Sequence, residues 1–547
     1  MQRRGFLKNS GMAGIGTLIG GRLSMASPST DSHIEVLVNE PIGLISPNIY
    51  GHFIEHIGGV VYDGVWVGKN SAIPNTEGIR AALIEKLRQI HAPMVRWPGG
   101  CFADSYDWKD GVGPDRPRRT NFWIDEFDSS RQKSKSVRVY ESNSFGTDEF
   151  LRFCKLIAAE PYLAVNVRSL PALEFDHWVE YCNSPAGSTS LAELRAKGGS
   201  VEPYNVTLWG VGNESWGCGG NFTPQDYASE FRRFTAWVPQ YGTPLEYIAS
   251  GPSDNDLNWT RGFFEKMFSM GDHSLSGWSV HHYAWNLSRG KTTDWLQAKG
   301  DSLQFEIVDW YEVFNQGFLI EKIIEEQWAA IGEYDEQHKI KLVIDEYGSW
   351  YRKGAEVSPE SVLSQQVTIR DALFTAFTLD VFNRHADKVS MAACAQLINC
   401  LNALFLAHED KFVVTPNFHV FDMYSDHQGG QSLRTEFSSP LAHYTRDGKA
   451  ATFWGLNGSS SLKGKLLVMT VVNADASSPR ETEIVLRGVG VASATAKILS
   501  GADIHAHNTF EHSQVSEPIA ASVRHSDNRM YFTFPAASVT KLTITLF

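Results

Sequence analysis

Residues 207–220 read TLWGVGNESWGCGG, a strand pattern with a carboxylate at its end. An apolar, β-prone run over residues 207–212 stops at Asn213 and Glu214, and aromatic residues and glycines follow. Burial of an unpaired carboxylate is costly, so Glu214 needs either a partner from elsewhere in the chain or a role in proton transfer. Half of a buried salt bridge gives the same local pattern, so this stretch alone leaves both interpretations open.

Similar short β-rich runs alternate with helical patterns from about residue 48 to about residue 405. In segments such as 78–92 and 224–238, apolar residues recur at three- and four-residue spacing, the helical period. Eight strands alternating with helices predict an α/β fold, a (β/α)₈ TIM barrel. A doubly wound open sheet is the alternative, but no strand is followed by a GxGxxG turn. The predicted strands are 49–54, 94–97, 162–167, 206–212, 245–250, 277–282, 340–344 and 391–397.

The remainder of the chain has a different pattern. After about residue 410 the helical period vanishes, and short strand runs are separated by turn residues; 539–547, VTKLTITLF, alternates apolar and polar residues. This pattern predicts an all-β, jelly-roll-like sandwich. Residues 33–47 precede the barrel and end at a proline, so we expect them to add a strand to it. The predicted domains are therefore a barrel at 48–405 and a sandwich formed by 33–47 and 406–547.

The N-terminal residues 1–26 look like a signal rather than part of the fold. Arg3 and Arg4 precede a Gly-rich apolar stretch, residues 11–21, and the small-x-small triplet SMA follows at 24–26. This order predicts a twin-arginine signal peptide and a periplasmic or secreted protein; a basic tail is the alternative. No other stretch is apolar for the length that a membrane helix requires, so we expect no membrane association.

Composition narrows the class of partner. The net charge of −13 argues against nucleic acid, because phosphate binding needs a basic surface. An aromatic share of 12% with 16 tryptophans suits sugar stacking, although large cores also use tryptophan. The cysteines form no CxxC pair and no zinc spacing, so disulfides and free thiols both remain open. They are Cys101, Cys154, Cys182, Cys218, Cys394 and Cys400.

Polar side chains gather where the predicted strands end, which is where such barrels place their sites. Each has a structural alternative: WPGG at 97–100 is commonly a tight turn, and the pair His281-His282 could suggest a metal site. Adjacent strand residues point to opposite faces, however, which disfavours a two-His chelate. Their coincidence at several strand ends favours a functional site. The candidates are Glu55, Arg96, Asn213, Glu214, His281, Tyr283, Glu346 and Gln396.

Two carboxylates facing each other across a neutral, aromatic-lined pocket suit cleavage of a glycosidic bond. One must be protonated and give its proton to the leaving oxygen, and the other must be ionised. Their environments must therefore differ. Arg96 and Tyr283 are candidates to keep one ionised, whereas Trp209 and Trp216 give Glu214 apolar neighbours that favour a protonated form.

Six segments, in this order, resemble the family 51 α-L-arabinofuranosidases, retaining glycosidases of clan A. The match covers roughly residues 34–547. The segments are GHFIEHIGGVVYDGVW, VRWPGGCFADSYDWKDGVGP, PYNVTLWGVGNESWGCGG, VHHYAW, IDEYGSWY and AQLIN.

The resemblance implies an activity and a role for each candidate. Glu214 would be the general acid/base and Glu346 the nucleophile of an exo-acting, retaining enzyme that releases L-arabinofuranose from arabinan- or arabinoxylan-type side chains. No metal or organic cofactor is implied, and family members often form trimers or hexamers. The arabinofuranose subsite would be lined by Glu55, Arg96, Asn213, Tyr283 and Gln396, with His281 in support.

One position departs from many family members. They carry Asn after the PGG turn, where this chain has Cys101, a weak hydrogen-bonding group. Other members share the cysteine, so we leave Cys101 out of the predicted site. The alternatives to an arabinofuranosidase are a related β-glucan endohydrolase and a non-catalytic carbohydrate-binding protein. A closed one-sugar pocket would favour the first function over the glucanase.

Overall fold

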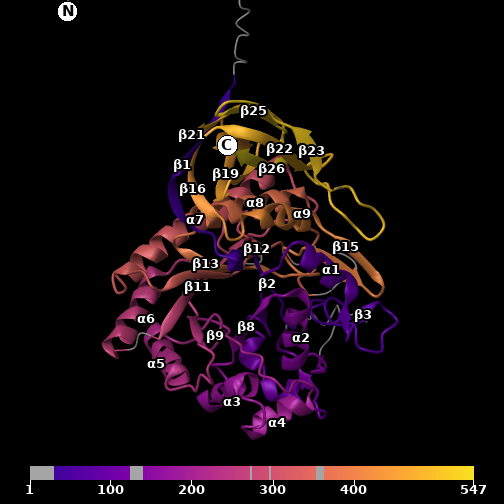
Figure 1. The fold of residues 1–547 in the computed structure, drawn as a ribbon, viewed down its shortest axis with the longest axis vertical. Coiled ribbons are helices and arrows are strands. Elements are labelled where there is room, and N and C mark those ends of the chain that lie inside the picture. Colours follow the sequence, from indigo (N-terminus) through magenta and orange to yellow (C-terminus); the bar gives the residue numbers. More distant parts are fainter. Residues whose placement is uncertain (1–29, 124–139, 272–273, 295–296, 353–361, 516) are drawn as a thin grey trace, which may run out of the picture.

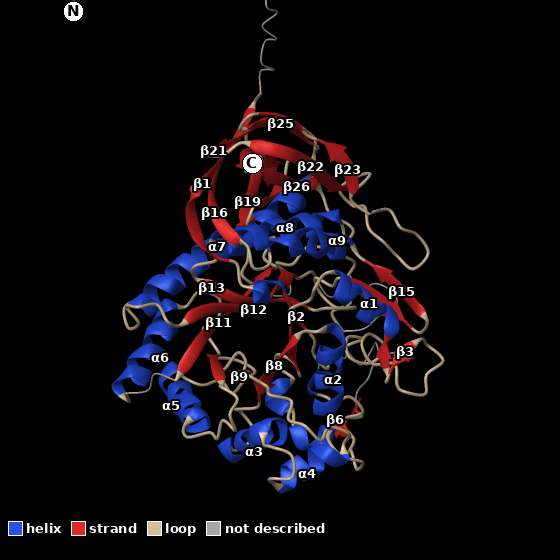
Figure 2. Cartoon of the chain, viewed as in Figure 1, coloured by secondary structure: helices blue, strands red, loops and turns tan. Residues whose placement is uncertain are grey.

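The structure is a computed structural model that describes residues 30–123, 140–271, 274–294, 297–352, 362–515 and 517–547. Eight parallel strands form a closed barrel in which neighbours along the chain pair with each other, and the eighth pairs with the first (Figures 1 and 2). The predicted TIM barrel is confirmed, and closure excludes an open sheet. The barrel strands are β2 (Gly51–Phe53), β5 (Met94–Trp97), β8 (Glu160–Val165), β9 (Leu208–Val211), β10 (Glu246–Ala249), β11 (Leu275–Ala284), β12 (Lys341–Ser349) and β13 (Val389–Ala395).

Side chains fill the interior of the barrel. Phe53, Met94, Tyr162, Leu208 and Ile248 belong to one buried cluster to which seven of the strands contribute. The barrel is therefore a packed core rather than a pore, as in other barrels of this type. This layer is the apolar floor beneath the polar strand ends.

The helices lie outside the ring of strands (Figure 2). In α5, Thr223 caps the first turn by accepting a hydrogen bond from Asp226 N, and Tyr227, Phe231 and Phe234 form the buried stripe at helical spacing. The helices are α1 (Ala81–Gln89), α2 (Thr147–Ile157), α3 (Ala172–Asn183), α4 (Ser190–Lys197), α5 (Pro224–Thr235), α6 (Leu257–Ser269), α7 (Ile307–Gly332), α8 (Ile369–Arg384) and α9 (Pro416–Tyr424).

A second, β-rich domain sits at the upper end of the molecule in Figure 1, formed by a 10-stranded sheet with its own core. Strands β22 and β24, far apart in the sheet order, contact each other, so the sheet folds back on itself. In sheet order the strands are β23 (Ile519–Ser522), β22 (Val491–Ser500), β26 (Ser538–Leu546), β20 (Leu466–Asn473), β19 (Leu456–Lys463), β16 (Gln431–Ser438), β1 (Ser32–Leu44), β21 (Arg480–Arg487), β25 (Arg529–Phe534) and β24 (Arg524–Ser526).

The N-terminal strand β1 lies inside this C-terminal sheet. It pairs antiparallel with β16 on one side and parallel with β21 on the other. Its buried residues Ile34 and Val36 alternate with more exposed ones and join the core of the sheet. The two ends of the described chain are thus held in one domain.

Helix α9 departs from the pattern expected after residue 410. Every residue of α9 except Asp422 is buried. A helix that is buried on nearly all sides shows no apolar stripe, so its period is not visible in the sequence. Short two-stranded elements complete the fold: β3 (Asn75–Thr76) with β4 (Ile79–Arg80), β6 (Arg119–Thr120) with β7 (Tyr140–Glu141), β14 (Phe405–His408) with β15 (Lys411–Val414), and β17 (Ala442–Arg446) with β18 (Lys449–Phe453).

Helix α8 joins the barrel to the β-rich domain through a buried carboxyl group. Asp380 accepts hydrogen bonds from Ser459 Oγ at 2.6 Å, Thr470 Oγ1 at 2.5 Å and Tyr424 OH at 2.8 Å. Burial raises the pKa of Asp380 to about 7, although the three hydroxyls oppose the shift. The contact between the domains therefore includes a group that titrates near neutrality.

The predicted twin-arginine signal at residues 1–26 lies outside the described residues. Among the helices that the structure describes, none combines the length and apolar character that a membrane crossing requires.

We predict that Asp380 makes stability depend on pH. The folded state holds the Asp380 proton up to about pH 7, whereas an unfolded aspartate loses it near pH 4. Stability from this group is therefore present at low pH and lost as the pH rises through 7. The melting temperature of the wild type should fall relative to that of Asp380→Asn between pH 5 and pH 9.

The exposed Asp115 provides the control, because Asp115→Asn should track the wild type at both pH values. The prediction would be contradicted if the melting temperatures of the wild type and Asp380→Asn changed with pH by the same amount across this range.

Candidate active site

The predicted residues all lie at the rim formed by the carboxyl ends of the barrel strands. A pocket of about 340 Å³ opens there. Arg96 and Asn213 are buried and hydrogen-bonded to each other, and the other predicted residues line the pocket, namely Glu55, Glu214, His281, Tyr283, Glu346 and Gln396. The structure thus brings together all the residues that the sequence predicted.

Glu346, within β12, is held by two donors. Arg96 Nη1 donates to Oε1 at 2.8 Å, and Tyr283 OH donates to Oε2 at 2.8 Å. Both oxygens are acceptors, and the hydrogen bond from the guanidinium is charge-assisted. The side chain is only 9% exposed. This carboxylate is therefore fixed in orientation before any substrate binds.

Arg96, within β5, is fully buried and connects three side chains. Besides Glu346 it donates from Nη2 to Asn213 Oδ1 at 2.7 Å, and its Nε lies 3.3 Å from Asp345 Oδ2. Its guanidinium carbon lies 4.7 Å from the centre of the Phe53 ring. Burial alone would lower the pKa of Arg96, but Asp345 and Glu346 raise it well above its ordinary value. Arg96 is a permanent cation beneath the pocket.

Asp345 belongs to the site but was absent from the predicted set. It accepts from Tyr162 OH at 2.8 Å and Ser279 Oγ at 2.5 Å, and lies 3.3 Å from His281 Nε2. Burial opposes ionisation, yet Arg96 and His281 hold its pKa well below the usual range. If the side chains of β12 alternated strictly between its two faces, either Asp345 or Glu346 would point away from the site. The pairings of β12 with both neighbouring strands are irregular in this region, so both residues reach it.

His281 bridges the two candidate carboxylates. Its Nδ1 lies 3.1 Å from Glu214 Oε1 and 3.7 Å from Glu346 Oε2. Burial would lower the pKa of His281, but Glu346, Asp345 and Glu214 together raise it to about 10. At neutral pH this imidazole is therefore cationic. One oxygen of Glu214, one oxygen of Glu346 and a ring nitrogen of His281 all lie within 4.8 Å of one another.

The neighbouring His282 points outward. Its Nε2 lies 2.8 Å from the carbonyl oxygen of Gln316 on α7. The expectation that the two histidines face opposite sides is confirmed, so they do not form a chelate.

Glu55, which follows β2, also lines the pocket. It accepts hydrogen bonds from Phe102 N at 3.0 Å and Gln396 Nε2 at 3.1 Å. Burial, reinforced by the nearby charge of Glu346, raises the pKa of Glu55 to about 8. At neutral pH Glu55 is mostly protonated and can both donate and accept hydrogen bonds.

The two glycines after Pro98 are required by close packing against these carboxylates. A Cβ on Gly99 would lie 2.7 Å from Glu55 Cγ, and a Cβ on Gly100 would lie 2.7 Å from Glu346 Oε1. Both distances are shorter than side chains tolerate. The WPGG segment is therefore part of the site rather than an ordinary turn.

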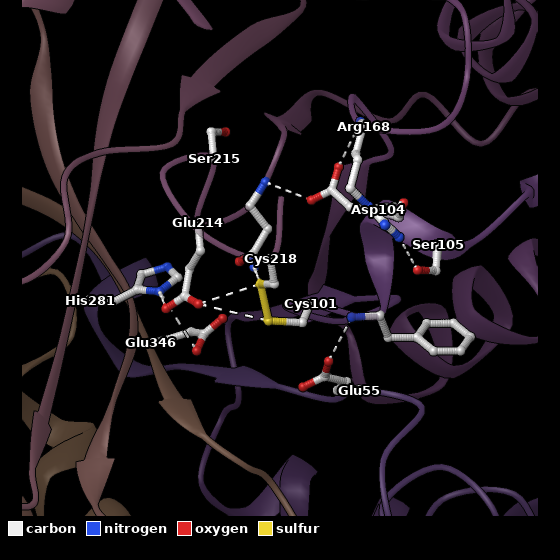
Figure 3. The surroundings of a disulfide bond; sticks show 12 residues. Glu55, Cys101, Asp104, Ser105, Arg168, Glu214, Ser215, Cys218, His281 and Glu346 are labelled. Atoms are coloured by element: carbon white, nitrogen blue, oxygen red, sulfur yellow. Dashed lines mark hydrogen bonds and ion pairs between the residues drawn. A yellow bond between two sulfur atoms is a disulfide. The ribbon is translucent and has the colours of Figure 1, made fainter. Parts of the chain in front are cut away.

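Cys101 and Cys218 form a disulfide at the pocket, with their Cα atoms 5.5 Å apart. Glu214 Oε2 lies 3.5 Å from Cys218 Sγ and 3.8 Å from Cys101 Sγ (Figure 3). The sequence left the cysteine states open and Cys101 outside the site, but Cys101 lines the pocket. The other four cysteines are buried and form no disulfide.

Asp104 is a second residue that sequence reasoning missed. It is fully buried and accepts from the backbone N–H groups of Val167 at 2.9 Å, Arg168 at 3.2 Å and Asn213 at 3.2 Å. Figure 3 shows Asp104 next to Arg168. Burial raises the pKa of Asp104 to about 7. Asp104 ties together the segments that follow β5, β8 and β9, and so supports the backbone at Asn213 and Glu214.

A closed (β/α)₈ barrel with two carboxylates facing each other at its carboxyl rim fits a glycoside hydrolase. Comparisons with known proteins specify the family. Two family models match, described as "Alpha-L-arabinofuranosidase C-terminal domain" over residues 345–538 and "Alpha-L-arabinofuranosidase 1 domain" over residues 86–299.

Individual proteins agree with these models. An intracellular exo-α-L-arabinofuranosidase of Bacteroides ovatus is 33% identical over 525 residues, covering 95% of this chain and 96% of its own length. The crystal structure of the GH51 arabinofuranosidase from Xanthomonas axonopodis pv. citri superimposes with a TM-score of 0.85 at 32% identity, covering 94% of this chain and all of the other. The chain belongs to the family 51 α-L-arabinofuranosidases, as the sequence motifs predicted, and its function is that of an arabinofuranosidase.

The predicted periplasmic or secreted location is wrong. The Bacteroides ovatus relative is named intracellular, and so is a Streptomyces lividans relative, 28% identical over 86% of this chain and 68% of its own length. Two arginines followed by a short, glycine-interrupted apolar stretch also fit the alternative of a basic tail, so this pattern was weak evidence for a signal peptide.

We predict that Gly100→Ala reduces hydrolysis strongly. The added methyl group must displace the Glu346 carboxylate, because Oε1 lies only 2.7 Å from the Cβ position. A misplacement of about 1 Å at a reacting group can lower the rate about 100-fold. The value of kcat/KM for 4-nitrophenyl α-L-arabinofuranoside measures the effect.

Gly217, three residues after Glu214, offers a matched control. A Cβ there meets only Glu214 O, at 3.7 Å, which is an ordinary contact. Gly217→Ala should keep activity within a few-fold of the wild type. Equal activities of the two variants would show that Gly100 is not needed to seat Glu346.

Proposed function

We propose that this enzyme is an exo-acting, retaining α-L-arabinofuranosidase that uses Glu346 as nucleophile and Glu214 as general acid/base. The observation that carries the proposal is the approach of one oxygen of each glutamate to within 4.8 Å. Retaining glycosidases hold their carboxyl groups about 5–5.5 Å apart, whereas inverting enzymes need about 6.5–9.5 Å to admit a water molecule. The geometry supports the retaining class.

In the first step, Glu346 attacks the anomeric carbon while Glu214 donates its proton to the leaving oxygen. The bond to the leaving group breaks as the bond between the sugar and Glu346 forms. Arg96 and Tyr283, which hold the two oxygens of Glu346, orient the nucleophile. In the second step, Glu214 takes a proton from water, which attacks the same carbon; the bond between the sugar and Glu346 breaks, the carboxylate is restored, and L-arabinose leaves with retained configuration.

The other polar groups are proposed to bind the arabinofuranose hydroxyls. Asn213 is oriented by Arg96 and by the backbone contact to Asp104, and we assign it to the 2-hydroxyl. Glu55 and Gln396 are hydrogen-bonded to each other at the pocket wall and are available to further hydroxyls. His281, cationic between the two glutamates, is assigned a supporting role for both.

The size and walls of the pocket support an exo mode of action. Its volume of about 340 Å³ lies at the lower end of the range for ligand sites. The alternative, a β-glucan endohydrolase, would need an extended cleft for a polymer. A non-catalytic sugar-binding protein would not need two opposed carboxylates with separate partners. Indole rings line the pocket and suit a sugar ring, namely Trp123, Trp216, Trp285 and Trp350.

The substrates are proposed to be arabinose-containing glycans of the arabinan and arabinoxylan type. Two relatives are named intracellular, and we propose that this enzyme likewise acts inside the cell, on oligosaccharides. The proposed mechanism has no step that requires a metal ion or an organic cofactor. Assembly into trimers or hexamers stays a prediction from the family resemblance.

We expect Glu346→Ala to abolish turnover almost completely, because the substitution removes the carboxylate that is proposed to attack the anomeric carbon. Azide is small enough to take the vacated position, and it should restore activity with formation of an inverted β-arabinosyl azide, identified by NMR. The exposed Glu333, paired with Arg261, provides the control Glu333→Ala, which should keep full activity. Substantial activity without azide would remove Glu346 from the nucleophile role.

Glu214→Ala should discriminate between leaving groups. General acid catalysis contributes about 10²–10⁴-fold, so hydrolysis of an arabino-oligosaccharide should fall by that factor. Release of 4-nitrophenol, a good leaving group, needs little protonation and should be slowed much less in the first step. Steady-state and pre-steady-state kinetics on both substrates make the comparison. Equal losses on both would argue against an acid role.

A further inference from the structure

The Cys101–Cys218 disulfide is the cysteine pair that small molecules can reach. Both residues are half-buried, and Cys101 lines the pocket. The four cysteines that are not in a disulfide are buried, namely Cys154, Cys182, Cys394 and Cys400. A thiol reductant small enough to enter the pocket can therefore reach this disulfide.

The disulfide touches the catalytic centre on one side of Glu214. Its two sulfurs lie 3.5 and 3.8 Å from Glu214 Oε2, while Oε1 faces His281 (Figure 3). Sulfur atoms in a disulfide carry no proton, so these contacts are not hydrogen bonds. In the oxidised form Oε2 therefore has no donor among these sulfurs and remains available for proton transfer.

Reduction of the disulfide would change the chemical groups that face Glu214. A dithiol reductant transfers two electrons and two protons: the Cys101–Cys218 bond breaks, each Sγ becomes a thiol, and the sulfurs of the reductant join in a disulfide. Reducing conditions of this kind are usual inside cells. The products are two thiols facing one carboxylate.

This set has the composition of a metal site. One atom from each of Cys101, Cys218 and Glu214 lies within 4.8 Å of the others. In tetrahedral zinc sites the Zn–S distance of about 2.3 Å places two sulfurs about 3.7 Å apart. Because the two Cα atoms are 5.5 Å apart, rotation of the cysteine side chains can provide that separation. Two thiolates, one carboxylate and one divalent ion sum to a single negative charge.

We propose that Cys101 and Cys218, when reduced, form with Glu214 a binding site for a thiophilic divalent cation such as Zn²⁺, and that occupancy removes Glu214 from proton transfer. Binding releases the two thiol protons to solvent, and no bond within the protein breaks. The inhibitory part rests on the proposed acid/base role of Glu214. The binding part does not depend on that role.

The proposed cation site can be tested with the full-length enzyme in two redox states. One sample keeps the disulfide, and the other is reduced with dithiothreitol that is then removed by anaerobic gel filtration. Co²⁺ serves as the probe, because cobalt–thiolate ligation gives a strong near-ultraviolet absorption band. The reduced enzyme should bind one Co²⁺ with this band, and Zn²⁺ should lower arabino-oligosaccharide hydrolysis about 100-fold, the scale of general acid catalysis. The disulfide form should show neither effect.

Variants locate the site. Cys218→Ser and, independently, Cys101→Ser should lose the cobalt band and the inhibition by Zn²⁺. Cys154→Ser, which removes a buried thiol in α2, should retain both. Absence of the band in reduced wild type, or its persistence in Cys218→Ser, overturns the proposal, as does Co²⁺ binding without loss of hydrolysis. A disulfide form that fails to hydrolyse arabinofuranosides would instead overturn the proposed function, and the cobalt band would still report on the site.

Discussion

The buried guanidinium of Arg96 is the interaction on which the site depends. It reaches Glu346 at 2.8 Å, Asn213 at 2.7 Å and Asp345 at 3.3 Å, and so connects β5, the end of β9 and β12. A charge at this depth is stable only with partners that satisfy it. The apolar layer beneath it, to which Phe53 belongs, keeps water out and strengthens each of these contacts.

Charge balance follows from that constraint. The negative charges of Asp345 and Glu346 are balanced by the positive charges of Arg96 and His281. Glu55 adds no third negative charge at neutral pH, because its pKa is raised to about 8. The same histidine also reaches Glu214. The site therefore holds several acidic groups in a small volume because each has a different electrostatic environment.

Much of this arrangement could be predicted from the sequence, because it follows from periodicity. Eight strand runs alternating with helices specified the barrel, and residues at strand ends, such as Glu214 and Glu346, must meet at one rim. What could not be predicted depends on local geometry. Asp345 faces the site through irregular strand pairing, and Cys101 meets Cys218 across 117 residues through two loops that have no period. The predicted export, read from two arginines and a weak apolar stretch, was wrong.

The position of β1 in the middle of a sheet that otherwise consists of C-terminal strands has a consequence for synthesis. Residues 32–44 leave the ribosome early, but their partners in β16 and β21 begin only at residues 431 and 480. At about 5–20 residues per second, this strand waits for roughly 20 seconds or longer with both edges unpaired. The exposed Glu40 and the proline that follows it would protect the strand during this interval. A charged residue and a proline on an unpaired strand edge disfavour pairing with other nascent chains.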